Sequence, residues 1–171
     1  CNTAGENSRL YDAVEAASLF AINLGINIPT GKDSLSMKQK YSDFEVLSPG
    51  TVIISATGVC SNIKQIVEPV LVNDQSNRIY YLNLSSDAFQ LGGSAFAQIL
   101  GGIGTYAPTI NDDIAFKQAF DRIQQAIKND LVLAGHDVAS GGLITTLLEM
   151  CFAENNLVAT LDLTVLNEQD D

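Results

Sequence analysis

One stretch, residues 135–143, combines residue types that could hold a phosphate group and a magnesium ion. Gly141 and Gly142 let the backbone approach a ligand closely, and the first N–H groups of a helix that starts there favour anions. Asp137 supplies a carboxylate, which magnesium accepts together with phosphate oxygens and water. The residue types therefore predict a phosphate and magnesium site. A plain tight turn capped by Ser140 is the alternative that the sequence leaves open.

Two flanking elements would position this stretch. Residues 131–134 are short and apolar, which predicts a buried strand. In residues 143–152 the apolar side chains recur three and four positions apart, which predicts an amphipathic helix. A strand would thus deliver His136 and Asp137 to a turn that the glycines permit.

A second candidate site is the loop that holds Gly31, Lys32, Asp33 and Ser34. Lys32 offers a point charge, Ser34 a hydroxyl and Gly31 an unobstructed N–H, all of which suit a phosphate. The arrangement is not a P-loop, because the upstream glycine is missing and a predicted helix, rather than a strand, precedes it. A solvated polar loop is the alternative.

The periodicity of the rest of the chain predicts a mixed α+β fold. Helices are expected at residues 8–24 (ending at Gly25), 63–67, 95–100 and 112–127. Strands are expected at 35–41, 51–60, 79–84, 131–134 and 158–163, with 35–41 paired to 51–60 through a turn at 48–50. The polar segment 72–78 predicts a boundary between two domains, 1–73 and 74–171.

Composition excludes several classes of protein. The 171 residues are 46% hydrophobic and 17% charged, which is typical of a folded chain. A net charge of −11 argues against a nucleic-acid partner. No apolar run approaches the ~20 residues of a membrane span, so we expect a cytoplasmic protein. Cys60 and Cys151, each in an apolar segment, are expected to be small core residues.

Three motifs, in this order and spacing, resemble phosphoribosylformylglycinamidine synthase, in particular its large, single-chain form. The motifs are Pro29-Thr30-Gly31-Lys32-Asp33-Ser34-Leu35-Ser36-Met37-Lys38, Leu91-Gly92-Gly93-Ser94, and His136-Asp137 followed by Gly141-Gly142-Leu143. The likeness extends over nearly the whole chain. The second and third motifs are shared, in looser form, with aminoimidazole ribonucleotide synthetase.

The resemblance implies part of an ATP-dependent amidotransferase of purine biosynthesis. Its reaction would convert formylglycinamide ribonucleotide, ATP and glutamine-derived ammonia to formylglycinamidine ribonucleotide, ADP and phosphate. It also implies the end of a synthetase-like N-terminal domain, followed by most of the C-terminal α/β domain. Remaining synthetase and glutaminase domains would be partners within a longer protein, and we expect this chain alone to be inactive.

The resemblance further implies residue roles and the cofactors ATP and Mg²⁺. Residues 31–34 would line a substrate or nucleotide phosphate site, with Ser34 contacting substrate. Asp137 would bind magnesium in a second, non-catalytic nucleotide site, beside Gly141 and Gly142. The family often has Ser-Asp before these glycines where this chain has Ala139-Ser140, which puts a hydroxyl contact in doubt. The alternative function is a non-catalytic nucleotide-binding or scaffold module.

Overall fold

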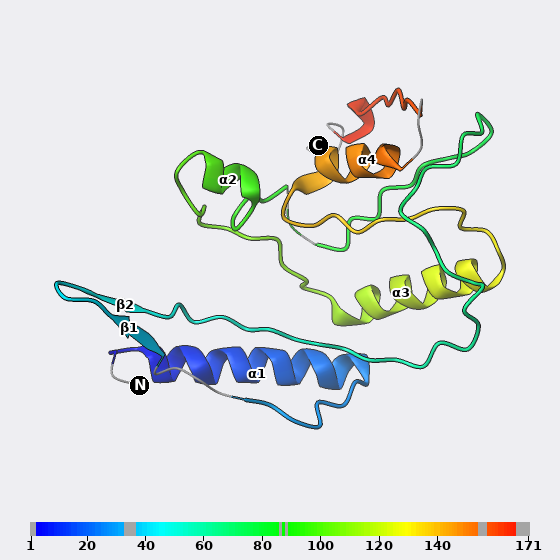
Figure 1. The fold of residues 1–171 in the computed structure, drawn as a ribbon. Coiled ribbons are helices and arrows are strands. Elements are labelled where there is room, and N and C mark those ends of the chain that lie inside the picture. The colour runs from blue at the N-terminus through cyan, green and yellow to red at the C-terminus, as the bar shows by residue number, and fades with distance from the viewer. Residues whose placement is uncertain (1–2, 33–36, 86, 88, 154–156, 167–171) are drawn as a thin grey trace. The chain divides into compact units, whose positions relative to one another are not determined.

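A computed structural model describes residues 3–32, 37–85, 87, 89–153 and 157–166. Four helices and one two-stranded sheet form in this part of the chain (Figure 1). The elements are α1 (Glu6–Leu24), β1 (Lys38–Lys40), β2 (Glu45–Leu47), α2 (Ala95–Ile99), α3 (Asp113–Lys128) and α4 (Gly142–Phe152), with a 3-10 turn at Thr164–Leu166. Two units can be distinguished, residues 1–61 with 112–117 and residues 62–111 with 118–171.

The first unit is built on α1, whose prediction is confirmed. The helix ends at Gly25, which has a φ of +74° and donates its N–H to the carbonyl of Ile22 at 3.0 Å. The N–H of Ile26 reaches back to the carbonyl of Ala21 at 2.8 Å. These two bonds satisfy carbonyls that a helix end would otherwise leave exposed. The glycine signal in the sequence therefore marked the true end of this helix.

The start of α3 lies against α1 in the same unit. The side-chain amide of Asn23 donates to a carboxylate oxygen of Asp113 at 2.6 Å. The rings of Phe20 and Phe116 are 5.7 Å apart and tilted by 56°, a favourable aromatic geometry. Asp112 caps α3, as predicted, by accepting the N–H of Ala115 at 2.8 Å.

The predicted pairing of residues 35–41 with 51–60 is wrong. The structure pairs β1 with β2, with Lys38 opposite Leu47 and Lys40 opposite Glu45. The turn between them is closed by the N–H of Tyr41, which donates to the carbonyl of Phe44 at 2.8 Å. A short local turn closes at a smaller entropic cost than a longer loop, and the sequence prediction overlooked it.

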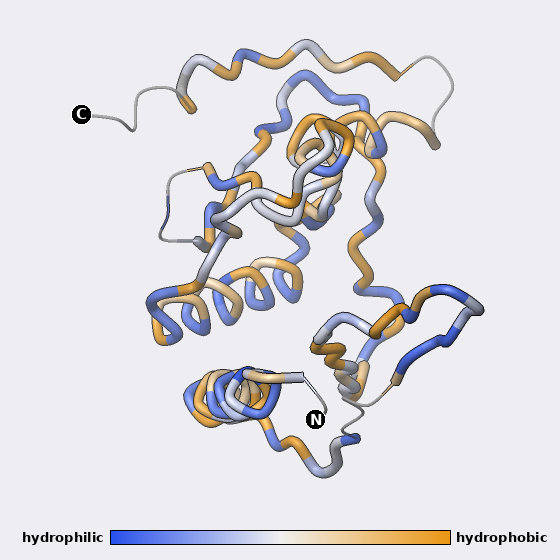
Figure 2. The backbone as a smooth tube through the Cα atoms, turned by 90° about the vertical axis from the view of Figure 1, so that its left-hand side faces the viewer, coloured by the Kyte–Doolittle hydropathy of each residue, from blue (hydrophilic) through white to orange (hydrophobic). Residues whose placement is uncertain are grey.

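The other predicted strands do not form either. Residues 51–60, 79–84, 131–134 and 158–163 form no regular helix or strand and belong to no sheet that the described chain contains. Ile53 is 85% exposed and Val59 99% exposed. Hydrophobic residues therefore occur along these irregular segments as well as on the helices (Figure 2). An apolar run indicates that its side chains favour burial. A strand also needs a neighbouring strand with which to form hydrogen bonds, and the run itself does not provide one.

Two smaller predictions also fail. Residues 63–67 form turns and bends rather than a helix. Cys60 is exposed rather than a core residue, whereas Cys151 is half-buried and within 3.4 Å of the Leu147 carbonyl. Within the described residues, burial is confined to Ala21 on α1 and to Thr146 and Met150 on α4. In the second unit the buried side chains thus belong to the helix that follows the candidate turn.

Candidate functional site

The turn at 135–142 is the best-defined part of the candidate site. At the end of the turn, the N–H of Gly142 donates a hydrogen bond to the carbonyl of Ala139 at 3.0 Å. Gly142 has a φ of +80°, a conformation that side chains with a Cβ rarely adopt. The helix α4 begins at this residue without a side-chain cap, so the alternative in which Ser140 caps it is wrong.

Asp137 combines a fixed backbone with an exposed carboxylate. Its main-chain carbonyl accepts a hydrogen bond from the hydroxyl of Thr146 at 3.2 Å, and Thr146 is only 5% exposed. The carboxylate itself is 86% exposed. Its Oδ1 lies 3.3 Å from Nδ1 of His136. A carboxylate that is held at its base and open at its tip is well placed to receive a cation from solvent.

The second glycine-rich turn, Leu91–Ser94, lies beside the first. The N–H of Ala95 donates to the carbonyl of Ser140 at 2.9 Å, so the start of α2 contacts the turn before α4 (Figure 1). Ser94 caps α2 by accepting the N–H of Ala97 at 3.1 Å. The sequence predicted both turns but not their contact, because nothing local signals a bond between residues 45 positions apart.

Close backbone approach explains one glycine of the second turn. The N–H of Gly92 donates to the carbonyl of Tyr106 at 2.8 Å. A Cβ on Gly92 would stand 2.3 Å from that same oxygen, well inside van der Waals contact. Gly93 has a φ of +77°, and its N–H donates to the carbonyl of Ile103 at 2.6 Å. Backbone hydrogen bonds to residues 103 and 106, together with the close approach at Gly92, thus hold this turn in place.

The loop that carries the other candidate residues belongs to the first unit. Gly31 and Lys32 lie in an irregular, exposed segment after α1. A Cβ on Gly31 would meet no atom within 4 Å. Asp33 and Ser34 lie outside the described residues. The predicted roles of all four residues therefore remain predictions.

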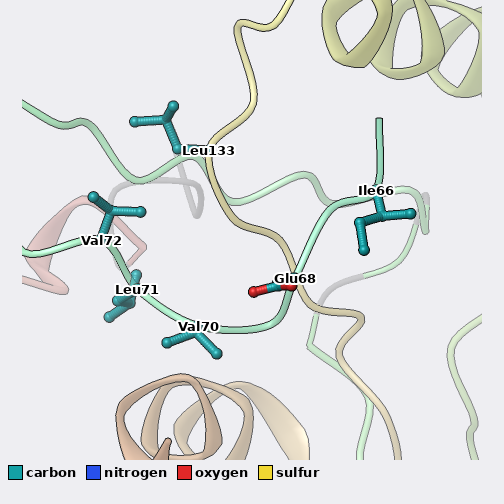
Figure 3. Close-up of a pocket in the computed structure, with 6 residues that line it drawn as sticks. All are labelled: Ile66, Glu68, Val70, Leu71, Val72 and Leu133. Carbon is teal, nitrogen blue, oxygen red and sulfur yellow. The ribbon is translucent and has the colours of Figure 1, made fainter. Parts of the chain in front are cut away.

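A cavity of about 320 Å³ lies in the second unit, near the segment that precedes the turn. Its lining residues are Ile66, Glu68, Val70, Leu71, Val72 and Leu133 (Figure 3). Two backbone bonds hold this region, from Gly135 N–H to the Glu68 carbonyl at 3.1 Å and from Leu71 N–H to the Met150 carbonyl at 3.0 Å. Aliphatic walls with a carboxylate would repel a phosphate, so the cavity does not suit that ligand.

A magnesium ion at Asp137 would need ligands beyond this turn. In the described part of the chain, no group of three or more His, Cys, Asp or Glu side chains is arranged so that it could hold a metal ion by itself. Magnesium commonly takes one or two carboxylates and completes its shell with water and phosphate oxygens. An exposed single carboxylate fits that pattern.

No described helix has the length and apolar character required to cross a membrane.

Comparison with protein families places two domains in the order that the sequence predicted. Residues 1–59 match the FGAR-AT PurM_N-like domain, and residues 77–170 match the AIR synthase related protein, C-terminal domain. The mixed α/β fold class and this domain order are thereby confirmed. No solved structure matches the chain.

Curated relatives carry the name that the motifs predicted. The Arabidopsis thaliana protein named probable phosphoribosylformylglycinamidine synthase, chloroplastic/mitochondrial, is 43% identical over 152 residues, 88% of this chain and 11% of its own length. The Caenorhabditis elegans probable synthase is 37% identical over 162 residues, 88% of this chain and 12% of its own. The human phosphoribosylformylglycinamidine synthase is 39% identical over 152 residues, again 88% and 11%.

The chain thus spans about a ninth of the length of these relatives. Their names confirm the predicted resemblance, and the C-terminal-domain match covers more than half of the chain. This chain belongs to the AIR synthase related family, and the three relatives described above are named phosphoribosylformylglycinamidine synthases.

Proposed function

We propose that this chain is part of an ATP-dependent synthetase that converts formylglycinamide ribonucleotide to formylglycinamidine ribonucleotide, with glutamine as the nitrogen donor. Family membership and the names of the relatives support the proposal. The structural observation that carries it is Asp137, whose side chain is 86% exposed in a turn that accepts hydrogen bonds from Thr146 of α4 and from Ala95 of α2.

The residues of this turn would act by binding and orienting. Asp137 would hold Mg²⁺, which neutralises phosphate charge when it is bound. Gly141 and Gly142 would let the backbone approach the phosphates of ATP or ADP, and the first N–H groups of α4 favour the same anion. The contact between Ala95 and Ser140 would keep the turn in place as the ligand enters.

The loop at residues 31–34 would serve a substrate or nucleotide phosphate. Lys32 would provide the positive charge, and Ser34 a hydroxyl toward the substrate, with Gly31 and Asp33 completing the loop. The exposed Gly31 and its empty surroundings leave room for a ligand against the backbone. No catalytic residue is assigned to this chain.

The domain boundary between residues 73 and 74 is part of the same proposal. It falls in the interval from 59 to 77, where one family match ends and the other begins. The other synthetase and glutaminase domains would be partners in a chain as long as the relatives. We propose a cytoplasmic location, although the name of the Arabidopsis relative gives chloroplasts and mitochondria for that protein.

The proposal is tested by an assay of the full-length protein that contains this chain. Formation of formylglycinamidine ribonucleotide, ADP and phosphate should require formylglycinamide ribonucleotide, ATP, Mg²⁺ and glutamine together. The 171-residue chain alone should form none of these products. A full-length protein that leaves the substrate unchanged, while a relative converts it under the same conditions, would contradict the proposal.

A non-catalytic nucleotide-binding or scaffold module is the second candidate function. It is favoured by the cluster of backbone contacts around Gly92, which would exist for packing alone. Thermal unfolding with and without Mg²⁺–ADP distinguishes a nucleotide-binding module from a scaffold module. A scaffold that serves packing alone should show no specific change in melting temperature with the nucleotide.

A further inference from the structure

One face of α4 is turned toward the residues that precede it. Thr146, Glu149 and Met150 are three and four positions apart, so they share a side of the helix. Thr146 and Met150 are buried, at 5% and 8% exposure. Thr146 donates its hydroxyl to the carbonyl of Asp137 at 3.2 Å. Glu149, on the same side, therefore faces the segment that carries the candidate metal ligand.

His136 bridges the two acidic side chains. Its Nε2 lies 3.3 Å from Oε2 of Glu149, and its Nδ1 lies 3.3 Å from Oδ1 of Asp137. The His136 side chain is 21% exposed and the Asp137 side chain is 86% exposed. The imidazole thus lies between Glu149 on one edge and the exposed carboxylate of Asp137 on the other.

We propose that Glu149 is a positioning residue for Asp137, acting through His136. The inference rests on the proposed function of Asp137 as the magnesium ligand of a nucleotide site. An exposed aspartate on its own samples several rotamers, and ordering it on binding costs free energy. If Glu149 holds the ring of His136 in place, that ring limits the rotamers of Asp137 before the ligand binds. Partners of metal ligands elsewhere commonly contribute 10–100-fold to metal affinity.

A purely structural role for Glu149 makes a different prediction. If the contact only anchors α4 to residue 136, its loss lowers the melting temperature of the free protein and does not act through magnesium. If Glu149 positions Asp137, its loss weakens Mg²⁺–ADP binding much more than binding of ADP alone. The amide oxygen of a glutamine can still accept from Nε2, so a conservative replacement should preserve the positioning role.

The experiment is calorimetric titration of the full-length protein with Mg²⁺–ADP and, in EDTA, with ADP. The variants are Glu149→Ala, Glu149→Gln and Asp137→Asn. Glu15→Ala is the matched control, since Glu15 is also a helix glutamate but contacts Tyr11 within α1. We expect Glu149→Ala to raise the Kd for Mg²⁺–ADP about 10-fold. Glu149→Gln and Glu15→Ala should bind as the wild type does.

The outcomes separate the two proposals. If Asp137→Asn binds Mg²⁺–ADP as tightly as the wild type, the proposed metal site is wrong and the role of Glu149 falls with it. If Asp137→Asn loses binding but Glu149→Ala does not, only the positioning role is overturned. Equal losses for Glu149→Ala with Mg²⁺–ADP and with ADP alone, together with a lower melting temperature of the free protein, would also overturn it in favour of a structural anchor.

Discussion

The turn at 135–142 and the loop at 31–32 are the two regions proposed to bind phosphate, and they are built differently. The turn is tied to α4 through Thr146, to α2 through Ala95 and to itself through Gly142. In the loop, a Cβ on Gly31 would meet nothing within 4 Å. The chain itself therefore fixes the geometry of the turn, whereas Gly31 is not required by local packing.

This difference separates two reasons for a glycine. In the turn and its neighbour, glycines satisfy a positive φ at Gly142 or a close backbone approach at Gly92. Replacing them should disturb the fold whether or not a ligand binds. At Gly31 the fold makes no such demand, so any effect of replacement should appear on ligand binding and catalysis.

Replacement of Gly92 by alanine should destabilise the protein most. The new Cβ would stand 2.3 Å from the Tyr106 carbonyl oxygen, so the backbone must shift and the Gly92–Tyr106 hydrogen bond is strained. We expect a loss of about 3 kcal/mol or more, measured from the urea midpoint of the full-length protein. A midpoint equal to that of the wild type would show that the contact between residues 92 and 106 does not hold this turn.

Replacement of Lys32 by alanine should lower catalytic efficiency with little effect on folding. A hydrogen bond to a charged group contributes roughly 1.5–3 kcal/mol, which corresponds to about one to two decades in kcat/KM. Steady-state kinetics of the full-length enzyme, with the melting temperature as the control, provide the measurement. Wild-type kinetics would return residues 31–34 to the alternative of a solvated loop.

The paired variants Gly142→Ala and Gly31→Ala should differ in stability. A residue with a Cβ at the φ of +80° found at Gly142 costs about 1–2 kcal/mol. Gly31→Ala enters open space, so its stability should stay within about 0.5 kcal/mol of the wild type. Urea unfolding of both variants tests the contrast directly. Equal destabilisation would show that the loop is as constrained as the turn.

The smallest expected effect is a pH dependence at Asp87, in the unit that holds the turn. Hydrogen bonds from the Thr109 hydroxyl and then from its N–H, with a smaller one from Asn111, lower the pKa of the Asp87 carboxyl below its usual 3.8. A lowered pKa means that the carboxylate stabilises the folded state above pH 3.8. That contribution is lost as the pH falls through the lower folded-state value. Asp87→Asn should therefore flatten this part of the acid unfolding curve, whereas an unchanged curve would remove the contact as its cause.

The sequence predicted the four helices that form in the described residues because their signals are local. Spacings of three and four residues, Gly25 after α1 and Asp112 before α3 are all read within one or two turns. The strands at 51–60 and 79–84 were predicted from equally clear apolar runs, but pairing depends on partners distant in the sequence. No strand partner is present for them in the described residues.

In the candidate site, too, the local features could be predicted from the sequence but the long-range contact could not. Asp137, Gly141 and Gly142 stand out because their residue types and spacing suggest phosphate chemistry. The bond from Ala95 to Ser140 joins two separate turns and left no trace in the local pattern. Glu149 could have been found from its spacing, since it lies three residues after Thr146 on the face that meets the turn.

If Asp137 holds a nucleotide-bound magnesium ion, the response of the full-length protein's melting temperature to Mg²⁺–ADP should depend on its carboxylate. Asp137→Asn preserves size but removes the charge. Saturating Mg²⁺–ADP at 100 times its Kd should stabilise the wild type by about 2.7 kcal/mol and raise its melting temperature. The variant should show little or no rise. An undiminished rise in Asp137→Asn would show that Asp137 does not hold the magnesium ion and serves only as a part of the turn.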